Sequence, residues 1–179
     1  IVPANSYIGT ILPVNAVGLK PIFVEPEKNT YNLDPQEIEK KITKKTKIII
    51  VTHLYGFVAQ MDKIIDLAKK YNLKVIEDCS QSHGAIFKDK CTGNFGDTGC
   101  FSLFPSKNLG AIGDAGIITT NNKKFYKILK YMRNYGEEDF IKYTDRKYKN
   151  IVKGFNSRMS EANASLLNLK IKDLDNMNI

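Results

Sequence analysis

Four side chains near the middle of the sequence are of types that can bind and transform a phosphorylated ring compound. Asp78 ends the apolar run "VIED", and Gln81 follows it by three residues. Ser102 precedes Lys107 by five residues, and Lys107 stands between "FSLFPS" and the glycine-rich "LGAIGDAG". A partly buried lysine loses affinity for its proton and becomes a usable nucleophile. A hydroxyl beside glycine-rich backbone can bind a phosphate, because small residues let N–H groups approach closely.

The combination of an aspartate, a serine and a lysine in this order indicates a pyridoxal phosphate site. Lys107 would form a Schiff base with the cofactor, and Asp78 would keep the pyridine nitrogen protonated so that the ring accepts electrons. Each residue also has an ordinary structural interpretation. Asp78 would cap the next helical turn, Ser102 would be a satisfied strand residue, and Lys107 would lie in a surface turn. The order of the three along the chain favours the cofactor site.

Alternating strands and helices must position these side chains. Asp34 as N-cap, Pro35 at the first helical position and Glu37 after them predict a helix over 34–42. Met61, Ile64, Ile65 and Ala68 share one face of a helix at 61–71, and further helices are expected at 122–134 and near the C-terminus. The expected strands are 21–25, 47–56, 73–78, 99–104 and 116–120.

This alternation predicts an α/β fold with a mostly parallel sheet flanked by helices. Ligands bind outside the carboxyl ends of strands in such sheets, which is where Asp78 lies. Residues 137–155 show weak periodicity and are expected to form an excursion from the regular pattern. The C-terminal helix is expected to carry its apolar side chains on one stripe, formed by Met159, Ala162, Leu166 and Leu169.

Composition excludes several classes of protein. The three cysteines include no CxxC pair and there are only two histidines, which argues against a disulfide framework or a structural zinc site and predicts free thiols. The chain contains no run of eighteen apolar residues, so no membrane span is predicted and a cytoplasmic location is expected.

The net charge of +8 comes without a nucleic-acid-binding motif, and a basic surface favours a small phosphate-bearing substrate. No GxGxxG follows a predicted strand, which argues against a dinucleotide-binding oxidoreductase.

Several motifs resemble those of the pyridoxal-phosphate-dependent sugar aminotransferases of the DegT/StrS type, which have the type I aminotransferase fold. They run through nearly the whole chain, and the last two are the most specific: "VPANSYIGT", "THLYG", "VIEDCSQSHGA", "GDTGCFSLFPSKNLGAIGDAG" and "GFNSRMSEANASLL". The resemblance implies that residues 1–179 are part of the large, cofactor-binding domain. The family's N-terminal phosphate loop and its small C-terminal domain are not found in this sequence.

The resemblance implies a role for individual residues. Lys107 corresponds to the Schiff-base lysine and Asp78 to the partner of the pyridine nitrogen. Gln81 corresponds to the contact of the cofactor's ring hydroxyl, and Ser102 to a ligand of its phosphate. Tyr7 would stack on the pyridine ring. Asn156 would reach the phosphate bound by the neighbouring subunit of a homodimer, or alternatively would cap the following helix in its own subunit. His53 and His83 are expected to be satisfied structural histidines rather than substrate contacts.

The activity implied by the resemblance is transfer of an amino group, commonly from glutamate, to a keto group of a nucleotide-linked deoxysugar. The product would be an amino sugar for polysaccharide, glycan or antibiotic assembly, and "PSKNLGAIGDAG" resembles members that act on 3-keto-6-deoxy sugars carried on dTDP. A sugar 3-dehydratase of the same superfamily would have histidine in place of Lys107. A non-catalytic regulator that keeps the cofactor fold is the alternative from another class.

Overall fold

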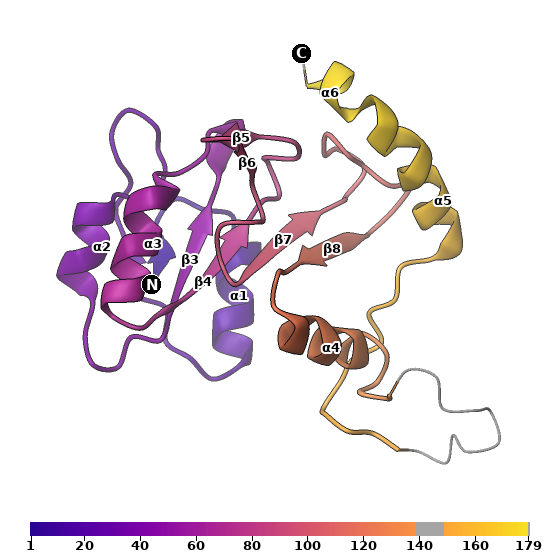
Figure 1. Cartoon of the computed structure of the whole chain (residues 1–179), viewed down its shortest axis with the longest axis horizontal. Helices are drawn as coiled ribbons and strands as arrows, with labels where there is room; N and C mark the ends of the chain where they lie inside the picture. Colours follow the sequence, from indigo (N-terminus) through magenta and orange to yellow (C-terminus); the bar gives the residue numbers. More distant parts are fainter. Residues whose placement is uncertain (139–148, 179) are drawn as a thin grey trace.

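A four-stranded sheet forms the centre of the protein in the computed structural model, which describes residues 1–138 and 149–178 (Figure 1). Its order is β3 (Ile48–Thr52), β4 (Lys74–Asp78), β7 (Thr98–Ser102) and β8 (Gly116–Thr119). The first three strands are parallel, and β8 pairs with β7 in the antiparallel sense. The predicted strand at 47–56 is too long, because the chain leaves the sheet after Thr52 and forms the 3-10 turn η1 (Leu54–Gly56).

A second parallel pair extends the sheet beyond β3. It consists of β1 (Val2–Pro3) and β2 (Phe23–Val24). The amino group of Ile1 donates to the carbonyl of Ile48 at 2.8 Å, and the Ile50 N–H donates to the carbonyl of Ile1 at 2.9 Å. These bonds join β1 to β3, and the prediction of a mostly parallel sheet flanked by helices is therefore confirmed. The structure adds an unpredicted hairpin, β5 (Ile86–Phe87) and β6 (Lys90–Cys91).

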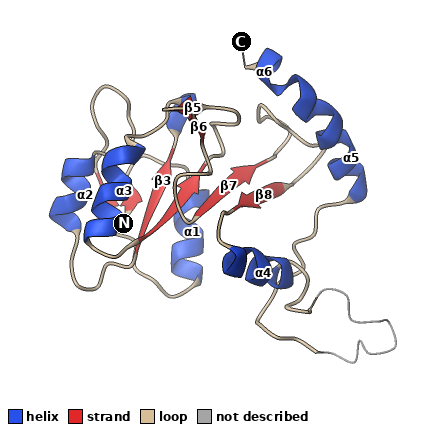
Figure 2. Cartoon of the chain, viewed as in Figure 1, coloured by secondary structure: helices blue, strands red, loops and turns tan. Residues whose placement is uncertain are grey.

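The helices α2 (Pro35–Lys41) and α3 (Met61–Lys70) pack against one another and bury the apolar residues that the sequence pattern indicates (Figure 2). The Asp34 carboxylate accepts from the Gln36 N–H at 2.8 Å, which confirms the predicted N-cap. Ile38, Met61 and Ile64 are fully buried in the larger apolar cluster. The helix α1 (Ile8–Ala16) was not predicted, because it carries Pro13 in its interior and has no amphipathic spacing.

A smaller apolar cluster lies beyond β7. It contains Leu103, Leu109, Ala111 and Leu167, the last from helix α5 (Glu161–Lys170). The structure differs from the expected stripe in two ways. Met159 precedes the helix and packs against this cluster, and the buried residue of α5 is Leu167, which is not part of the stripe, whereas Leu169 is 65% exposed. The remaining elements are α4 (Lys123–Met132), the 3-10 turn η3 (Ile171–Asp173) and α6 (Leu174–Met177), and α5 and α6 run along the right-hand edge of Figure 1. Part of the expected excursion at 137–155 lies outside the described residues. Among the helices that the structure describes, none is both long and apolar enough to cross a membrane.

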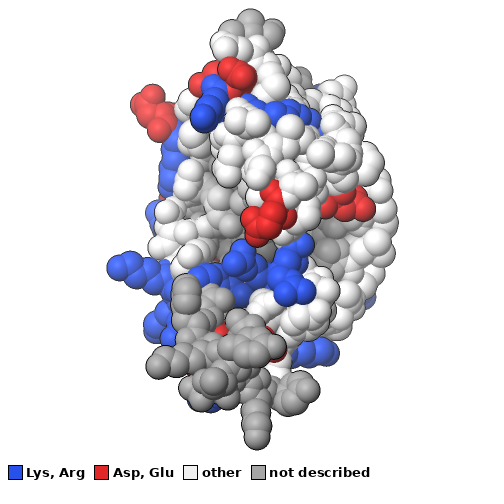
Figure 3. Space-filling view, turned by 90° about the vertical axis from the view of Figure 1, so that its right-hand side faces the viewer, with Lys and Arg blue, Asp and Glu red and all other residues white. Residues whose placement is uncertain are grey.

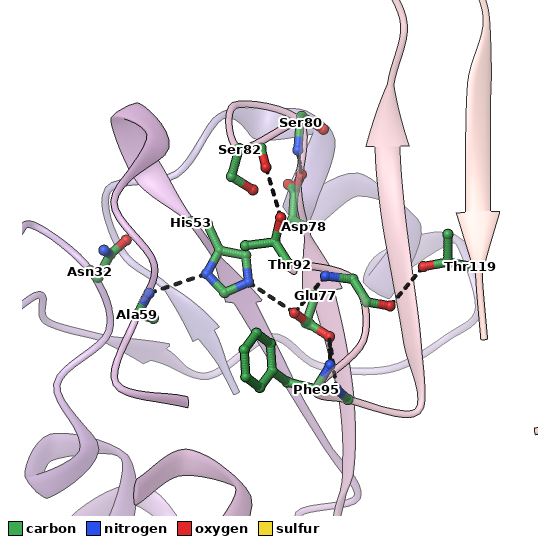
Figure 4. Close-up of polar contacts among 12 residues, drawn as sticks. Asn32, His53, Ala59, Glu77, Asp78, Ser80, Ser82, Thr92, Phe95 and Thr119 are labelled. Atoms are coloured by element: carbon green, nitrogen blue, oxygen red, sulfur yellow. Dashed lines mark hydrogen bonds and ion pairs between the residues drawn. The ribbon is translucent and has the colours of Figure 1, made fainter. Parts of the chain in front are cut away.

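A buried carboxylate, Glu77, holds the carboxyl end of β4 in place (Figure 4). It accepts hydrogen bonds from the backbone N–H groups of Gly93, Phe95 and Gly96 at 2.7–2.8 Å, and from His53 Nε2 at 3.1 Å. The Ala59 N–H donates to His53 Nδ1, so the His53 proton is on Nε2 and both ring nitrogens are satisfied. His53, Glu77 and Cys79 are near enough to share a metal ion, but the hydrogen bonds already use the histidine and the carboxylate. His53 is confirmed as a structural histidine.

The 93–96 loop reaches Glu77 because β7 has a glycine at the point of closest approach. A Cβ on Gly99 would lie 2.3 Å from the Cα of Gly93, so any other residue would force the loop away from the carboxylate. Burial alone raises the pKa of Glu77, but the hydrogen bonds from His53 and from the backbone of Gly96 and Gly93 outweigh it and bring the pKa below its ordinary value.

We expect Glu77→Gln to lower the free energy of unfolding by about 3 kcal/mol, because the amide turns a donor toward backbone N–H groups. The folded-state pKa of Glu77 is depressed, so its stabilisation is full above the ordinary value of 4.5 and is lost as the pH falls through the folded pKa. Urea unfolding from pH 7 to pH 3 measures both effects. The variant should show a weaker loss of stability below pH 4.5.

Glu39→Gln is the matched control, because Glu39 is also hydrogen-bonded but lies at the surface. It should leave the urea midpoint nearly unchanged at pH 7. A Glu77→Gln protein with the stability of the original chain would show that the carboxylate does not hold the loop.

Candidate active site

The parallel strands β3, β4 and β7 end at one edge of the sheet, and the sequence-predicted residues gather there. Asp78, the last residue of β4, is paired in register with Thr52 on β3 and with Cys100 on β7. Ser102 is the last residue of β7. Gln81 and Lys107 are carried by the loops that follow β4 and β7. The edge has the location that α/β proteins use for ligands.

Lys107 lies in an ordered bend rather than in a loose surface turn. The Ala111 N–H donates to the carbonyl of Leu103, and the Leu103 N–H donates to the carbonyl of Ala115, which closes the base of the bend. A Cβ on Gly110 would lie 2.4 Å from the carbonyl oxygen of Pro105, so the glycine lets the two arms approach. Lys107 itself is half-buried. The apolar and glycine-rich flanks thus hold the backbone of Lys107 at a defined place at the pocket.

Gln81 and Lys107 line the same pocket, which has a volume of about 570 Å³. This volume is in the range of sites for cofactors and small ligands. The pocket is built from the loop after β3, the loop after β4, the Lys107 bend and the residue after α6. Its wall consists of Tyr55, Gly56, Ser80, Gln81, Ser82, His83, Gly84, Ala85, Ser106, Lys107, Asn108 and Asn178.

The Gln81 amide is held in one orientation by the backbone of the neighbouring loop. Its Oε1 accepts from the Tyr55 N–H at 2.8 Å. Tyr55 has a φ of 55°, a conformation that places this N–H toward Gln81 and that is uncommon for a residue other than glycine. Since Oε1 is used, the NH₂ group is the part of the amide that is available to a ligand. Gln81 can therefore donate to an anionic oxygen in the pocket.

His83 is not the fully hydrogen-bonded structural histidine that the sequence led us to expect. Its Nε2 lies 2.9 Å from the carbonyl of Ser102, so Nε2 carries the proton and donates. Its Nδ1 is buried without a hydrogen-bond partner among the described residues. Burial lowers the pKa of His83, the bond to the Ser102 carbonyl raises it, and the nearby Lys107 lowers it again, leaving the pKa below its ordinary value. A neutral imidazole thus stands in the pocket wall near Lys107.

Asp78 does not line the pocket, but it is hydrogen-bonded to Ser80, which does. Its Oδ1 accepts from the Ser80 N–H at 3.1 Å, as the structural interpretation of a turn cap predicts, and its Oδ2 accepts from the Thr10 hydroxyl at 2.7 Å. Among the described residues, the Ser102 hydroxyl accepts a hydrogen bond from the Phe104 N–H, at 3.4 Å. Tyr7 is the N-cap residue of α1, and its ring is 77% exposed.

Asn156 is placed apart from these residues. It is exposed, forms an isolated bridge with Asn134, and its Oδ1 accepts from Arg158 Nε at 3.3 Å. The interpretation of Asn156 as the cap of the next helix is wrong, because the N-cap of α5 is Ser160, whose hydroxyl accepts from the Asn163 N–H at 3.2 Å.

Asn178 fixes the width of the pocket and was not predicted from the sequence. Its Nδ2 donates to the carbonyl of His83 at 2.7 Å, and its Oδ1 accepts from the Asn108 amide at 2.8 Å. It therefore bridges the loop that carries Gln81 and the bend that carries Lys107. No local pattern could have revealed a contact between residues that lie 95 positions apart. Tyr55 was missed as well, although the "LYG" sequence gives a turn signal.

The two cysteines near this edge are inert thiols. Burial, with smaller contributions from nearby carboxylates, raises the pKa of Cys79 and raises that of Cys100 to about 11. Both remain protonated at neutral pH and are poor nucleophiles. All the cysteines are free, as predicted.

The sequence of the chain matches the DegT/DnrJ/EryC1/StrS aminotransferase family over residues 1–179. It is 51% identical over 178 residues to the dTDP-3-amino-3,6-dideoxy-alpha-D-galactopyranose transaminase of Aneurinibacillus thermoaerophilus, a match that covers 99% of this chain and 47% of that protein. The chain thus spans about half the length of the curated relatives that it matches.

Solved structures show the same fold. An aminotransferase from Psychrobacter cryohalolentis superposes with a TM-score of 0.93 at 31% identity, over 98% of this chain and 46% of that one. NtdA from Bacillus subtilis, solved with bound cofactor PMP, superposes with a TM-score of 0.84 at 36% identity, over 97% of this chain and 38% of that one. The expected aminotransferase fold is confirmed.

The Asn178 bridge leads to a prediction about local stability. Asn178→Ala should speed amide hydrogen exchange in residues 82–84 and 106–110 by about tenfold, because each lost hydrogen bond contributes roughly 1 kcal/mol. Hydrogen exchange read by mass spectrometry measures this. Asn176→Ala, in the same short helix, is the control and should leave both loops unchanged. Equal exchange in the two variants would contradict the bridge.

Proposed function

Because the chain belongs to the DegT/DnrJ/EryC1/StrS aminotransferase family, we propose that it carries the central part of a pyridoxal-phosphate-dependent nucleotide-sugar aminotransferase. The reaction is the transfer of an amino group, from glutamate, to a keto group of a nucleotide-linked deoxysugar. The observation that carries the proposal is the pocket that Lys107 and the oriented amide of Gln81 both line. The product is an amino sugar for polysaccharide assembly in the cytoplasm.

The residues at this edge of the sheet fit pyridoxal phosphate. The free NH₂ group of Gln81 suits a phenolic oxygen, and the carboxylate of Asp78 suits a cationic ring nitrogen. His83 Nδ1, buried without a partner among the described residues, marks a polar place that a ligand or water can fill. The names of the relatives support the same cofactor and substrate class.

Each residue has a separable task in the reaction. When bound, pyridoxal phosphate supplies an electron sink that stabilises negative charge on the carbon next to the transferred nitrogen. Lys107 offers its Nζ as the point of covalent attachment and afterwards as the base that moves a proton within the pocket. Asp78 holds a proton at the ring nitrogen. Gln81 binds the ring oxygen, and Ser102 contributes to binding the phosphate.

The surface charge is consistent with a substrate that bears phosphates. The chain has a net charge of +8. On the face that Figure 3 shows, Lys and Arg side chains form a band across the middle of the molecule. Such a band raises the local concentration of an anionic substrate and its rate of association. The diphosphate of a nucleoside diphosphate sugar is negatively charged and would be attracted to this band.

The proposal includes a homodimer with shared sites. Asn156 lies away from the Lys107 pocket of its own chain, on an exposed segment before α5. Leu169 and Ile171 at the end of that helix are more than half exposed. An interface on this side would cover these apolar side chains and bring Asn156 to the phosphate of a partner's cofactor. In a two-fold dimer this contact occurs twice, so both sites would need both chains.

We expect the purified protein with pyridoxal phosphate to absorb in the visible, and borohydride to fix the mass of the cofactor on Lys107. Lys107→Ala should lose the visible band, the label and the turnover of keto sugars with glutamate. Peptide mass spectrometry measures the site of labelling. Lys63→Ala, an exposed lysine on α3, is the control and should retain all three.

Labelling of a different lysine would refute the assignment of Lys107. Labelling at Lys107 without turnover of any nucleotide keto sugar would indicate a regulator that keeps the cofactor fold. Loss of a hydroxyl without amino transfer would indicate a dehydratase.

Mixing two inactive variants tests the shared site. In a heterodimer of Lys107→Ala and Asn156→Ala subunits, one site keeps both residues if Asn156 acts on the partner, and activity should recover to about half of the original value per heterodimer. A mixture of Lys107→Ala with Asp78→Asn is the control, since both residues lie in one chain's site and mixing should restore nothing. Subunit exchange is confirmed by native mass spectrometry. Proven exchange without recovery would contradict the shared site.

A further inference from the structure

A continuous chain of hydroxyl groups ends on the carboxylate of Asp78. The Thr10 hydroxyl lies 2.7 Å from Asp78 Oδ2, the Ser6 hydroxyl lies 2.7 Å from that of Thr10, and the Thr52 hydroxyl lies 3.1 Å from that of Ser6. Thr10 is 7% exposed and Thr52 is 4% exposed. The chain therefore runs along a mostly buried path from β3, through the start of α1, to the end of β4.

The carboxylate fixes the direction of these hydrogen bonds. An ionised carboxylate only accepts, so the Thr10 hydroxyl must donate to Asp78. With its proton committed, the Thr10 oxygen accepts from Ser6, and the Ser6 oxygen in turn accepts from Thr52. All the hydroxyl dipoles then point toward Asp78. Hydrogen bonds that all point the same way polarise one another, so this series of hydroxyl groups holds the carboxylate more firmly than a single hydrogen bond would.

The same turn of α1 also places the ring of Tyr7. A Cβ on Gly9 would lie 3.1 Å and 3.2 Å from two carbons of that ring, so the absence of a side chain lets the ring lie against the helix. The Thr10 N–H donates to the carbonyl of Tyr7 at 3.0 Å. Tyr7 and the hydroxyl that holds Asp78 are thus parts of one hydrogen-bonded turn.

We propose that Thr10 is a positioning residue that fixes the carboxylate of Asp78 relative to the ring of Tyr7. The inference rests on the proposed function, in which the carboxylate holds a proton on the cofactor's ring nitrogen, and on the stacking of Tyr7 on that ring that the family resemblance implies. The Ser80 N–H fixes Oδ1 and the Thr10 hydroxyl fixes Oδ2. With both oxygens held, the carboxylate keeps one orientation relative to the first turn of α1, which carries Tyr7.

The test uses Thr10→Val, which keeps the shape and removes the hydroxyl, and Thr10→Ser, which restores the hydroxyl. Each variant is loaded with pyridoxal phosphate labelled with ¹⁵N in the ring, and the ¹⁵N chemical shift reports whether the nitrogen carries a proton. Thr10→Val should shift the signal part-way toward the unprotonated form and lower kcat about tenfold, with KM for glutamate unchanged. Thr10→Ser should retain the original shift and most of kcat.

Two controls separate this inference from the proposed function. Thr119→Val removes a hydroxyl bond of 2.7 Å to the carbonyl of Gly93 and should leave the ¹⁵N signal unchanged. Asp78→Asn should remove the proton from the ring nitrogen altogether. If Asp78→Asn has no effect, the role of Asp78 is refuted and the role of Thr10 with it. If Asp78→Asn removes the proton and Thr10→Val does not alter it, only the role of Thr10 is refuted.

Ser6→Ala keeps the inference testable if Thr10→Val does not fold, because it breaks the hydroxyl chain one step farther from Asp78. It should shift the ¹⁵N signal in the same direction as Thr10→Val and by less. In that case, an unchanged ¹⁵N signal in a folded Ser6→Ala protein would overturn the inference.

Discussion

The carboxylate of Glu77 is the interaction on which the candidate site depends. A buried charge costs free energy because it loses its hydration. For the Glu77 carboxylate this cost is offset by hydrogen bonds from three backbone N–H groups and from the imidazole of His53. Those donors come from the loop after β3 and from the loop before β7. The carboxylate therefore ties the end of β4 to the loop that follows β3 and to the loop that leads into β7. Asp78, the next residue along β4, follows directly from this fixed point.

The two chemical groups of the site belong to different apolar clusters. Asp78 and Gln81 follow a strand whose Val75 lies in the larger cluster, whereas the Lys107 bend is held by Leu109 and Ala111 in the smaller one. The pocket lies between these two regions. Polar bonds join them there, from His83 to the carbonyl of Ser102 and from Asn178 to both loops. The relative position of the Lys107 bend and Asp78 is thus set by the pairing of β4 with β7 and by these few hydrogen bonds rather than by one continuous core.

The sequence predicted what depends on local pattern. The strand that ends at Asp78, the helix capped by Asp34 and the bend around Lys107 all follow from apolar periodicity, capping residues and glycines. Residues that act over a distance were not predicted. Thr10 and Asn178 reach the site from segments far apart in the chain, and α1 is hidden by its interior Pro13. From the sequence alone, Glu77 is indistinguishable from an ordinary strand residue, because its role depends on the 93–96 loop that covers it.

Adjacent positions on β4 serve opposite sides of the sheet. Glu77 points into the nest of backbone amides (Figure 4), whereas Asp78 accepts a hydrogen bond from Thr10 of α1, because successive side chains of a strand alternate. The insertion or deletion of one residue within β4 would exchange the two sides. The anchoring carboxylate would then face the hydroxyl of Thr10, and the shorter aspartate would be left to reach the amides. The length of β4 is therefore constrained separately from the packing of its apolar side chains in the core.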